Sequence, residues 1–376
     1  MIYLDNAATT LEKPPSVAKA ISYAITHYAS PGRGGYPAAM RAGELMYQCR
    51  ETASSMFDVP NLEQVVLTAS ATHGLNIAIR TLVEPGDTVL ISGYEHNAVT
   101  RSLHAIPEVT VKIVNAPLFD TEGAYAAFEQ MLTQDVDVVI YNHVSNAFGF
   151  IQPMDRIARL CRQRNKPLIV DAAQSAGMVP VSLARWGAAF VAMPGHKGLY
   201  GPQGTGLLLC GEQPRPILYG GTGSLSIQQE MPDFLPDRLE AGTPNVCGAA
   251  GLLAGMRHVQ RLGVENVGRR ERRLCRHMMD LLAAIPGVRI FRGEKSQIGL
   301  FSFLIAGKDC ETVSQQLGEA GVAVRAGLHC APLAHQTAGT LESGTVRASF
   351  SIFNRSDQIE RAADLICAIA KNKRAS

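Results

Sequence analysis

Residues 188–202 read AAFVAMPGHKGLYGP, an apolar run followed by a histidine and a lysine among glycines. The apolar run has the pattern of a buried strand. His196 and Lys197 would then stand at the carboxyl end of that strand, where open α/β sheets bind ligands. A surface lysine in a solvated turn is the ordinary interpretation. The alternative is a lysine whose amine reacts with an aldehyde, since burial at such a place lowers the pKa of a lysine.

Short apolar strands surround this stretch and alternate with helical segments. The expected strands are 64–70 (QVVLTAS), 88–93 (TVLISG), 109–116 (VTVKIVNA), 136–145 (VDVVIYNHVS), 167–174 (PLIVDAAQ), 188–195 and 205–210 (TGLLLC). Amphipathic helices are expected between them, for example over 72–83 and 95–106. This alternation predicts the α/β class, with a mostly parallel sheet and helices on both of its faces.

The length of 376 residues exceeds the usual size of a single compact core, so we expect two domains. A stretch rich in glycine and proline, 211–248, ends the alternation of strands and helices. We therefore assign residues 21–250 to a large α/β domain and residues 251–376 to a smaller C-terminal α+β domain. Residues 1–20 are expected to pack on the smaller domain.

The composition narrows the class of protein. Apolar residues make up 46% of the chain and charged residues 18%, which is typical of a globular enzyme and argues against a disordered protein. A net charge of +2 argues against binding to nucleic acid or to a membrane surface. We see neither a spanning segment nor a signal peptide. The eight cysteines are scattered without CxxC pairs or metal-ligand spacing, so we expect reduced thiols, no metal site and a cytoplasmic location.

Polar residues at the ends of the expected strands suggest one ligand. Asp171 ends the run LIVD, and a buried carboxylate needs a cationic partner, such as a pyridinium nitrogen. Thr72 opens a helix and could bind a phosphate, although Ser70 or Thr72 could equally be a plain helix cap. His96 could stack on a ring or simply begin a helix. Singly, each residue favours the ordinary structural role; together they indicate an aromatic, phosphorylated ligand with a carbonyl group.

Several longer motifs carry a family resemblance. They are YLDNAATT (3–10), SATHGLNIAI (70–79), EHNAV (95–99), NHVSNAFG (142–149), VDAAQSAG (170–177), GHKGLYGPQGTG (195–206), RLEAGTPN (238–245), RAGLHCAP (325–332) and VRASFSIFN (346–354). With these motifs the chain resembles the class V aminotransferase superfamily of fold-type I PLP enzymes, and within it the cysteine desulfurases and selenocysteine lyases. The resemblance implies a mostly parallel seven-stranded sheet in the large domain.

The resemblance also implies a cofactor, pyridoxal 5'-phosphate (PLP), bound covalently to Lys197. The other implied contacts are Asp171 at the pyridine nitrogen, His96 stacked on the ring, Gln174 at the ring hydroxyl, Asn146 at the ring oxygen or the substrate, Thr72, Ala71 and His196 at the phosphate, and Thr243 at the phosphate of a partner subunit. Thr243 therefore implies a homodimer.

The implied reaction is that of a cysteine desulfurase. Cys330 would attack the sulfur of L-cysteine, carry it as a persulfide and pass it to a thiol or a sulfur-carrier protein, while alanine leaves. Lys197 would move protons on the substrate, with His96 beside it. Arg347 would bind the substrate carboxylate, for which a guanidinium is well shaped. His329 beside Cys330 and Arg325 nearby form a setting that favours the thiolate.

Three positions depart from the family pattern. Pro194 replaces a serine that commonly donates to the phosphate, and His73 stands where an acidic residue is common. In the segment 33–36, Tyr36 replaces a histidine near the substrate, so we count Tyr36 among the substrate-binding residues. These changes leave open a selenocysteine lyase or another PLP-dependent β-lyase or aminotransferase. A catalytically inactive assembly partner and an α/β binding protein without PLP are further alternatives.

Overall fold

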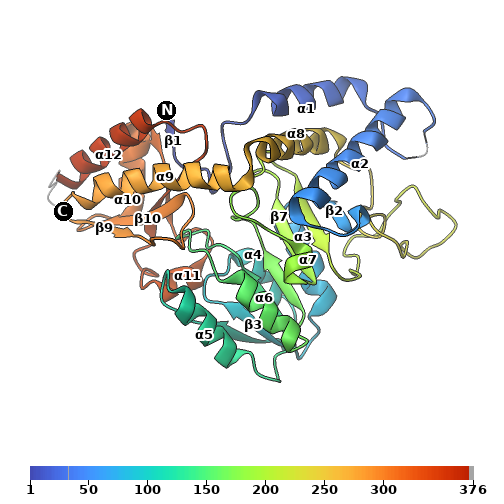
Figure 1. The fold of residues 1–376 in the computed structure, drawn as a ribbon, viewed down its shortest axis with the longest axis horizontal. Helices are drawn as coiled ribbons and strands as arrows, with labels where there is room; N and C mark the ends of the chain where they lie inside the picture. Colours follow the sequence, from blue (N-terminus) through green and yellow to red (C-terminus); the bar gives the residue numbers. More distant parts are fainter. Residues whose placement is uncertain (33, 372–376) are drawn as a thin grey trace.

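The structure, a computed structural model, describes residues 1–32 and 34–371. Its centre is a seven-stranded sheet of order β2-β8-β7-β6-β5-β3-β4 (Figure 1). The strands are β2 (Val65–Thr68), β3 (Thr88–Ser92), β4 (Thr110–Val114), β5 (Val138–Asn142), β6 (Leu168–Asp171), β7 (Phe190–Pro194) and β8 (Gly206–Cys210). Strand β8 is antiparallel to both of its neighbours, and the other neighbouring pairs are parallel. The prediction of a mostly parallel α/β sheet with seven strands is confirmed.

The central strands β5, β6 and β7 are apolar up to their last residue because both faces of the sheet are covered. Val139 and Val191 belong to one hydrophobic core, whereas the adjacent Ile140 and Ala192 belong to another. Successive side chains of a strand point to opposite faces, so each face has its own core. The elements that surround the sheet are α2 (Pro37–Phe57), η1 (Leu62–Gln64), α3 (Ala71–Leu82), α4 (Asn97–His104), α5 (Thr121–Met131), α6 (Met154–Gln163) and α7 (Leu183–Trp186).

A second sheet lies towards the C-terminus and is antiparallel throughout. Its strands, in spatial order, are β12 (Arg325–Gly327), β13 (Thr345–Ser349), β10 (Leu300–Ile305) and β9 (Val288–Phe291). The helices of this region are α9 (Val264–Ala283), α10 (Cys310–Glu319), α11 (Pro332–Thr337) and α12 (Ser356–Lys371). Helix α9 runs from the large sheet to this second unit (Figure 1). No helix of the described residues is long and apolar enough to cross a membrane.

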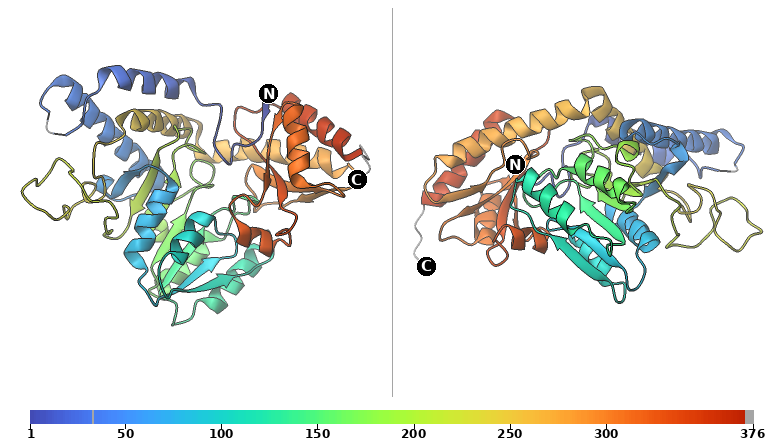
Figure 2. Two further views of the ribbon diagram at one scale, coloured as in Figure 1. Left: turned by 180° about the vertical axis from the view of Figure 1, so that it is seen from behind. Right: turned by 60° about the horizontal axis from the view of Figure 1, so that its bottom comes forward.

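The N-terminal segment reaches both ends of the molecule. Strand β1 (Ile2–Tyr3) pairs in parallel with β11 (Val322–Ala323), whereas helix α1 (Pro15–His27) packs on α8 (Val246–Leu262). Figure 2 shows the N-terminus beside the orange and red elements, with the blue helices α1 and α2 at the opposite end. Our division into residues 1–20, 21–250 and 251–376 stays a prediction; its boundary at residue 250 falls inside α8.

Glu271 is a carboxyl group buried where α9 crosses the chain that follows β7. Its Oε1 accepts a hydrogen bond of 3.1 Å from the hydroxyl of Tyr200, and its Oε2 has no hydrogen-bond partner among the described residues. Burial raises the pKa of Glu271 to about 8. The folded protein therefore holds a proton on Glu271 that the unfolded chain loses near the ordinary value of 4.5.

We expect Glu271→Gln to make the protein more resistant to unfolding at alkaline pH. Since the folded pKa is raised, the wild type loses stability as the pH rises from about 5 to about 8, and the neutral amide does not. The free energy of unfolding of the variant minus that of the wild type should rise by a few kcal/mol over this range, at about 1.4 kcal/mol per pH unit, and then level off. Denaturant unfolding at several pH values measures it. Glu342→Gln, at an exposed position, is the control; a constant difference for Glu271→Gln would contradict the prediction.

Candidate active site

Lys197 lies in a tight turn directly after β7, as the sequence predicts. Within the turn, Tyr200 N–H donates to the carbonyl of Lys197 at 2.9 Å, and Gly201 N–H donates to the carbonyl of Gly195 at 2.7 Å. A side chain at Gly195 would collide with Thr205, so the glycine is needed for close packing. Burial lowers the pKa of Lys197 to about 8. Roughly a tenth of the amine is therefore neutral, and thus nucleophilic, at pH 7.

Asp171 ends β6 next to this turn. Its buried Oδ1 accepts a hydrogen bond of 2.8 Å from Ala173 N–H. Burial raises the pKa of Asp171, while Ala173 N–H and the charge of Lys197 oppose the rise. The structure thus places a buried carboxylate within the electrostatic influence of the lysine, where a cationic ring nitrogen would stabilise its charge.

Gln174 follows Asp171 and is also buried. Its Nε2 donates to the carbonyl of Ala7 at 3.0 Å, which fixes the orientation of the amide. Its Oε1 has no partner among the described residues. This oxygen is a buried acceptor available to a ligand hydroxyl.

His96 caps helix α4 with its ring. Nδ1 accepts a hydrogen bond of 3.0 Å from Ala98 N–H, so the proton of the neutral ring is on Nε2. Burial first, and then the charges of Lys197, Arg347 and Arg101, lower the pKa of His96 to about 4. The imidazole is therefore a neutral, flat ring at neutral pH, which suits stacking on an aromatic ligand.

Cys330 is held beside His96 through the backbone. Asn97, the first residue of α4, donates its N–H to the carbonyl of Cys330 at 2.7 Å. The Nδ2 of Asn146 donates to the carbonyl of His329 at 2.7 Å. His329 and Cys330 both have positive φ angles, 52° and 54°, which are uncommon for residues other than glycine. Two hydrogen bonds from the large sheet region therefore anchor an unusual turn that presents the thiol.

The remaining cysteines differ from Cys330 in exposure. All eight lie in the described part of the chain as free thiols, and Cys330 is the exposed one. Burial raises the pKa of Cys49 and of Cys161 to about 12. A buried thiol of this kind is a poor nucleophile at neutral pH. Exposure thus singles out Cys330, as the sequence motif predicts.

Arg347 lies on β13 and is buried near the same turn. Its Nη1 donates to the carbonyl of Asn146 at 2.9 Å, and its Nη2 pairs with Asp5 at 3.0 Å. Arg325, half-exposed, pairs with the other oxygen of Asp5 at 3.1 Å. Two guanidinium groups thus share one carboxylate, which leaves one positive charge. This surplus charge favours the entry of a carboxylate-bearing substrate.

Asp5 was missed as a site residue by the sequence analysis. The motif YLDNAATT contains it, but its position at the far N-terminus gave no indication of a partner. Its bridge to Ser349 on β13 and its ion pairs with two arginines appear only in the fold. The available signal was a carboxylate directly after the apolar run MIYL.

The residues predicted for the phosphate differ in burial. His196 is partly buried, and its Nδ1 has no partner among the described residues. Burial first, and then Lys197 and Lys13, lower the pKa of His196 to about 4. At the start of α3, the hydroxyl of Ser70 accepts from His73 N–H, so Ser70 rather than Thr72 caps the helix. Thr72 is exposed on the first turn, next to the buried Ala71.

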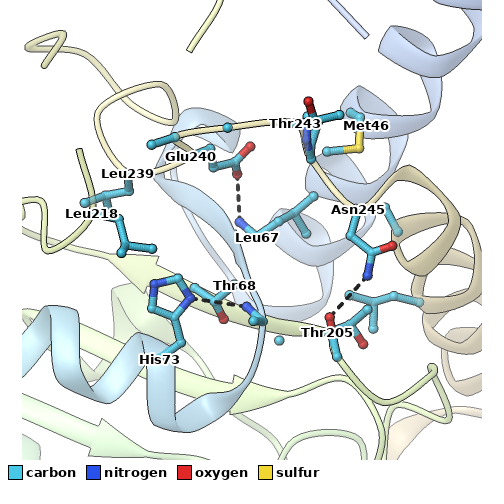
Figure 3. Close-up of a pocket in the computed structure, with 18 residues that line it drawn as sticks. Met46, Leu67, Thr68, His73, Thr205, Leu218, Leu239, Glu240, Thr243 and Asn245 are labelled. Atoms are coloured by element: carbon cyan, nitrogen blue, oxygen red, sulfur yellow. Dashed lines mark hydrogen bonds between the residues drawn. The ribbon is translucent and has the colours of Figure 1, made fainter. Parts of the chain in front are cut away.

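Thr243 lies on the long loop between β8 and α8 and lines a pocket of about 210 Å³ (Figure 3). Glu240 ties this loop to the large unit, because its carboxylate accepts from Leu67 N–H at 2.8 Å and pairs with Arg50 at 2.5 Å. His73, one of the departures from the family pattern, lines the same pocket. Thr243 itself is exposed, and no described contact joins it to Lys197 of its own chain.

The other departures have plain structural positions. Pro194 is the last residue of β7 and lies opposite Gly206. Tyr36 precedes α2 and is 54% exposed. No described contact joins it to the lysine cluster, by which we mean Lys197, Asp171, Gln174 and His96. Its role in substrate binding stays a prediction. Arg33 of the same segment lies outside the described residues.

The residues brought together fit PLP. The electrophilic aldehyde, the ring nitrogen and the ring hydroxyl of PLP match the neutral amine of Lys197, the carboxylate of Asp171 and the unpaired Oε1 of Gln174. The neutral ring of His96 and the unpaired Nδ1 of His196 supply a stacking surface and a further polar contact. Buried polar atoms without partners are costly unless a ligand or water satisfies them.

Comparisons with known proteins agree with this arrangement. A family model described as Aminotransferase class-V matches residues 2–362. A probable cysteine desulfurase of Mycolicibacterium paratuberculosis is 33% identical over 96% of this chain, which spans about half (54%) of that relative. A probable cysteine desulfurase of Methanothermobacter thermautotrophicus is 31% identical over 98% of this chain and 94% of its own length. The apo structure of a cysteine desulfurase from Thermococcus onnurineus has a TM-score of 0.89 and 28% identity, over 98% of this chain and 94% of that one. The chain therefore belongs to the class V aminotransferase family, and it shares its fold with a solved cysteine desulfurase, as the sequence motifs predict.

Proposed function

We propose that this protein is a PLP-dependent cysteine desulfurase that converts L-cysteine to L-alanine and carries the sulfur as a persulfide on Cys330. The observation that carries the proposal is the position of the exposed thiol of Cys330. The backbone carbonyl of Cys330 accepts a hydrogen bond from the N–H of Asn97, the residue after His96, so the thiol lies near the residues around Lys197. Relatives named cysteine desulfurases support the choice of substrate.

PLP, when bound, would supply an electron-withdrawing ring that makes the α-proton of the substrate acidic. Lys197 would hold its aldehyde carbon covalently, Asp171 its ring nitrogen and Gln174 its ring hydroxyl, with His96 stacked on the ring. The other proposed contacts are Asn146 at the ring oxygen or the substrate, His196, Thr72 and Ala71 at the phosphate, and Thr243 of a partner subunit.

The chain's own residues would then perform the transfer. The guanidinium groups of Arg347 and Arg325 bind the substrate carboxylate, and the amine of Lys197 moves the proton at the α-carbon. The thiolate of Cys330 attacks the sulfur of the substrate, so that an S–S bond forms and the C–S bond breaks. The electron pair of the broken bond stays with the substrate carbon, which takes up a proton and becomes the methyl group of alanine. The persulfide then passes to an acceptor thiol, which we expect on a small molecule or a carrier protein.

The test of this function is the release of alanine from L-cysteine by purified protein supplied with PLP and a reducing thiol. Alanine and sulfide in equal amounts support a desulfurase. Turnover of L-selenocysteine without turnover of L-cysteine would show a selenocysteine lyase, and formation of pyruvate would show a different β-lyase. A protein that stays colourless with PLP and turns over neither substrate would contradict the proposal at the level of the cofactor.

We expect the uptake of PLP by the apoprotein to accelerate as the pH rises through about 8. The neutral amine of Lys197 is the reactive form, and it becomes predominant above the lowered pKa of about 8. Stopped-flow absorbance at several pH values measures the rate, which should rise between pH 7 and 9 and then level off. A midpoint near the ordinary lysine value of 10.5 would contradict the lowered pKa.

We propose a homodimer in which Thr243 completes the phosphate site of the partner. The exposure of Thr243 and the anchoring of its loop by Glu240 support this arrangement. Sedimentation equilibrium should give twice the mass of the chain, and Thr243→Val should weaken PLP binding without changing that mass. A fully active monomer would contradict the dimer. A cytoplasmic location remains our proposal and rests on the scattered free thiols.

A further inference from the structure

His329, the residue before Cys330, forms a buried pair with a second histidine, His335. His329 Nδ1 is 3.2 Å from Nε2 of His335, and His335 Nδ1 is 2.8 Å from the hydroxyl of Thr340. His329 Nε2 is 3.2 Å from the carbonyl of Arg325 on β12. His335 is fully buried on α11, and its ring packs against Phe148. Nothing in the proposed reaction uses His335.

With both rings neutral, the hydrogen bonds of this chain of groups run in one direction. A carbonyl accepts, so His329 Nε2 must carry a proton for the carbonyl of Arg325. The neutral ring of His329 then has a lone pair on Nδ1, to which His335 donates from Nε2. His335 Nδ1 in turn accepts from the hydroxyl of Thr340. Each ring is neutral and both of its nitrogens are satisfied.

The surroundings keep both rings neutral. Burial first lowers the pKa of His335 to about 4, and burial lowers the pKa of His329 well below its ordinary value. The charged groups that act on the pair are Arg347 and Arg325, both cationic, and each disfavours a further positive charge on His329. The direction of the hydrogen bonds is therefore stable at neutral pH.

The histidine pair influences the position of the Cys330 thiol through the backbone of His329 and Cys330. His329 and Cys330 both adopt positive φ angles, a conformation that persists only where surrounding contacts hold it. The backbone carbonyl of His329 is held by Asn146, and its ring is held by Arg325 and His335. Without the donor from His335, Nδ1 of His329 would be a buried acceptor with no partner, and the ring would be held by the carbonyl of Arg325 alone.

We propose that His335 is a positioning residue for sulfur transfer: its Nε2–H holds the ring of His329 and thereby the left-handed turn that presents the thiol of Cys330. The inference rests on the proposed function, because it concerns the attack of Cys330 on the substrate sulfur. It assigns His335 no contact with substrate or cofactor.

The experiment compares His335→Phe, which removes the donor but keeps a ring, with His335→Gln, whose Nε2 restores a donor. Thr340→Val is a second variant, farther from the thiol. Each holoenzyme is assayed for kcat and KM with L-cysteine and for the rate at which iodoacetamide alkylates Cys330. We expect His335→Phe to lower kcat by about 10²-fold with KM within about twofold, since small misplacement of a reacting group costs this much. His335→Gln should recover most of the loss, and Thr340→Val should fall between the two.

The alkylation rate separates this inference from the proposed function. If the wild type releases no alanine, the proposed function fails, and a change in alkylation of Cys330 by His335→Phe but not by His335→Gln still supports the positioning role. Equal kcat and alkylation rate in all variants would overturn the inference. Equal impairment of His335→Phe and His335→Gln, with KM raised and melting temperature lowered in both, would show a packing role instead and would also overturn it. If His335→Phe does not fold, the comparison of His335→Gln with Thr340→Val decides by the same criteria.

Discussion

Cys330→Ser should lower the release of alanine from L-cysteine by on the order of 10³-fold or more, because a serine hydroxyl cannot accept the sulfur. The substitution replaces one sulfur atom of an exposed residue by oxygen. It leaves in place the hydrogen bond from the N–H of Asn97 to the backbone carbonyl of residue 330. PLP binding should therefore be unchanged, as measured by the absorbance of the holoenzyme. The loss should appear in kcat, measured by quantifying alanine under saturating L-cysteine.

Cys367→Ser is the matched control for this prediction. Cys367 is a partly buried thiol on α12 and packs against the hydrophobic core between α9, α12 and the C-terminal sheet, not against Lys197. Its substitution should leave alanine release within about twofold of the wild type. Equal rates for Cys330→Ser and the wild type would remove Cys330 from the reaction and favour direct elimination from the substrate.

Lys197→Ala should abolish turnover, with a loss on the order of 10³-fold or more, because both the covalent attachment and the proton transfer depend on the same amine. Borohydride reduction of the wild type with PLP should fix the cofactor on the peptide that contains Lys197, and the variant should show no such product. Mass mapping of the reduced protein measures this directly.

Lys166→Ala is the control for Lys197→Ala. Lys166 lies just before β6, at the opposite end of that strand from Asp171. Its amine donates to the carbonyl of Gln134 and has no described contact with Asp171 or His96. Its substitution should preserve both turnover and trapping. Trapping on Lys166 or on Lys13 in the wild type, instead of Lys197, would contradict the assignment of the cofactor lysine.

The large sheet could be predicted because each of its central strands has a recognisable local sequence pattern. Both faces of β5, β6 and β7 are buried, so their sequences are continuous apolar runs rather than alternating ones. Strand ends then predicted where polar residues would meet, and the charge of Lys197 does act on both Asp171 and His96.

Contacts between distant parts of the chain could not be predicted in the same way. The pair of Asp5 with Arg347 joins residues that are 342 positions apart, and no local pattern records it. The left-handed conformations of His329 and Cys330 are equally invisible in sequence, since glycine and asparagine are the usual markers of positive φ. The sequence could not decide between Ser70 and Thr72 as the helix cap, because both side chains carry a hydroxyl group. The structure shows that Ser70 is the cap.

The measurement that tests the central claim most directly is the location of sulfur on the wild-type protein after a brief reaction with L-cysteine in the absence of an acceptor thiol. Peptide mass mapping should find a gain of one sulfur atom on the peptide that contains Cys330, in proportion to the alanine formed. Alanine formed without a sulfur gain on Cys330, or with the gain on another of the eight cysteines, would contradict the account.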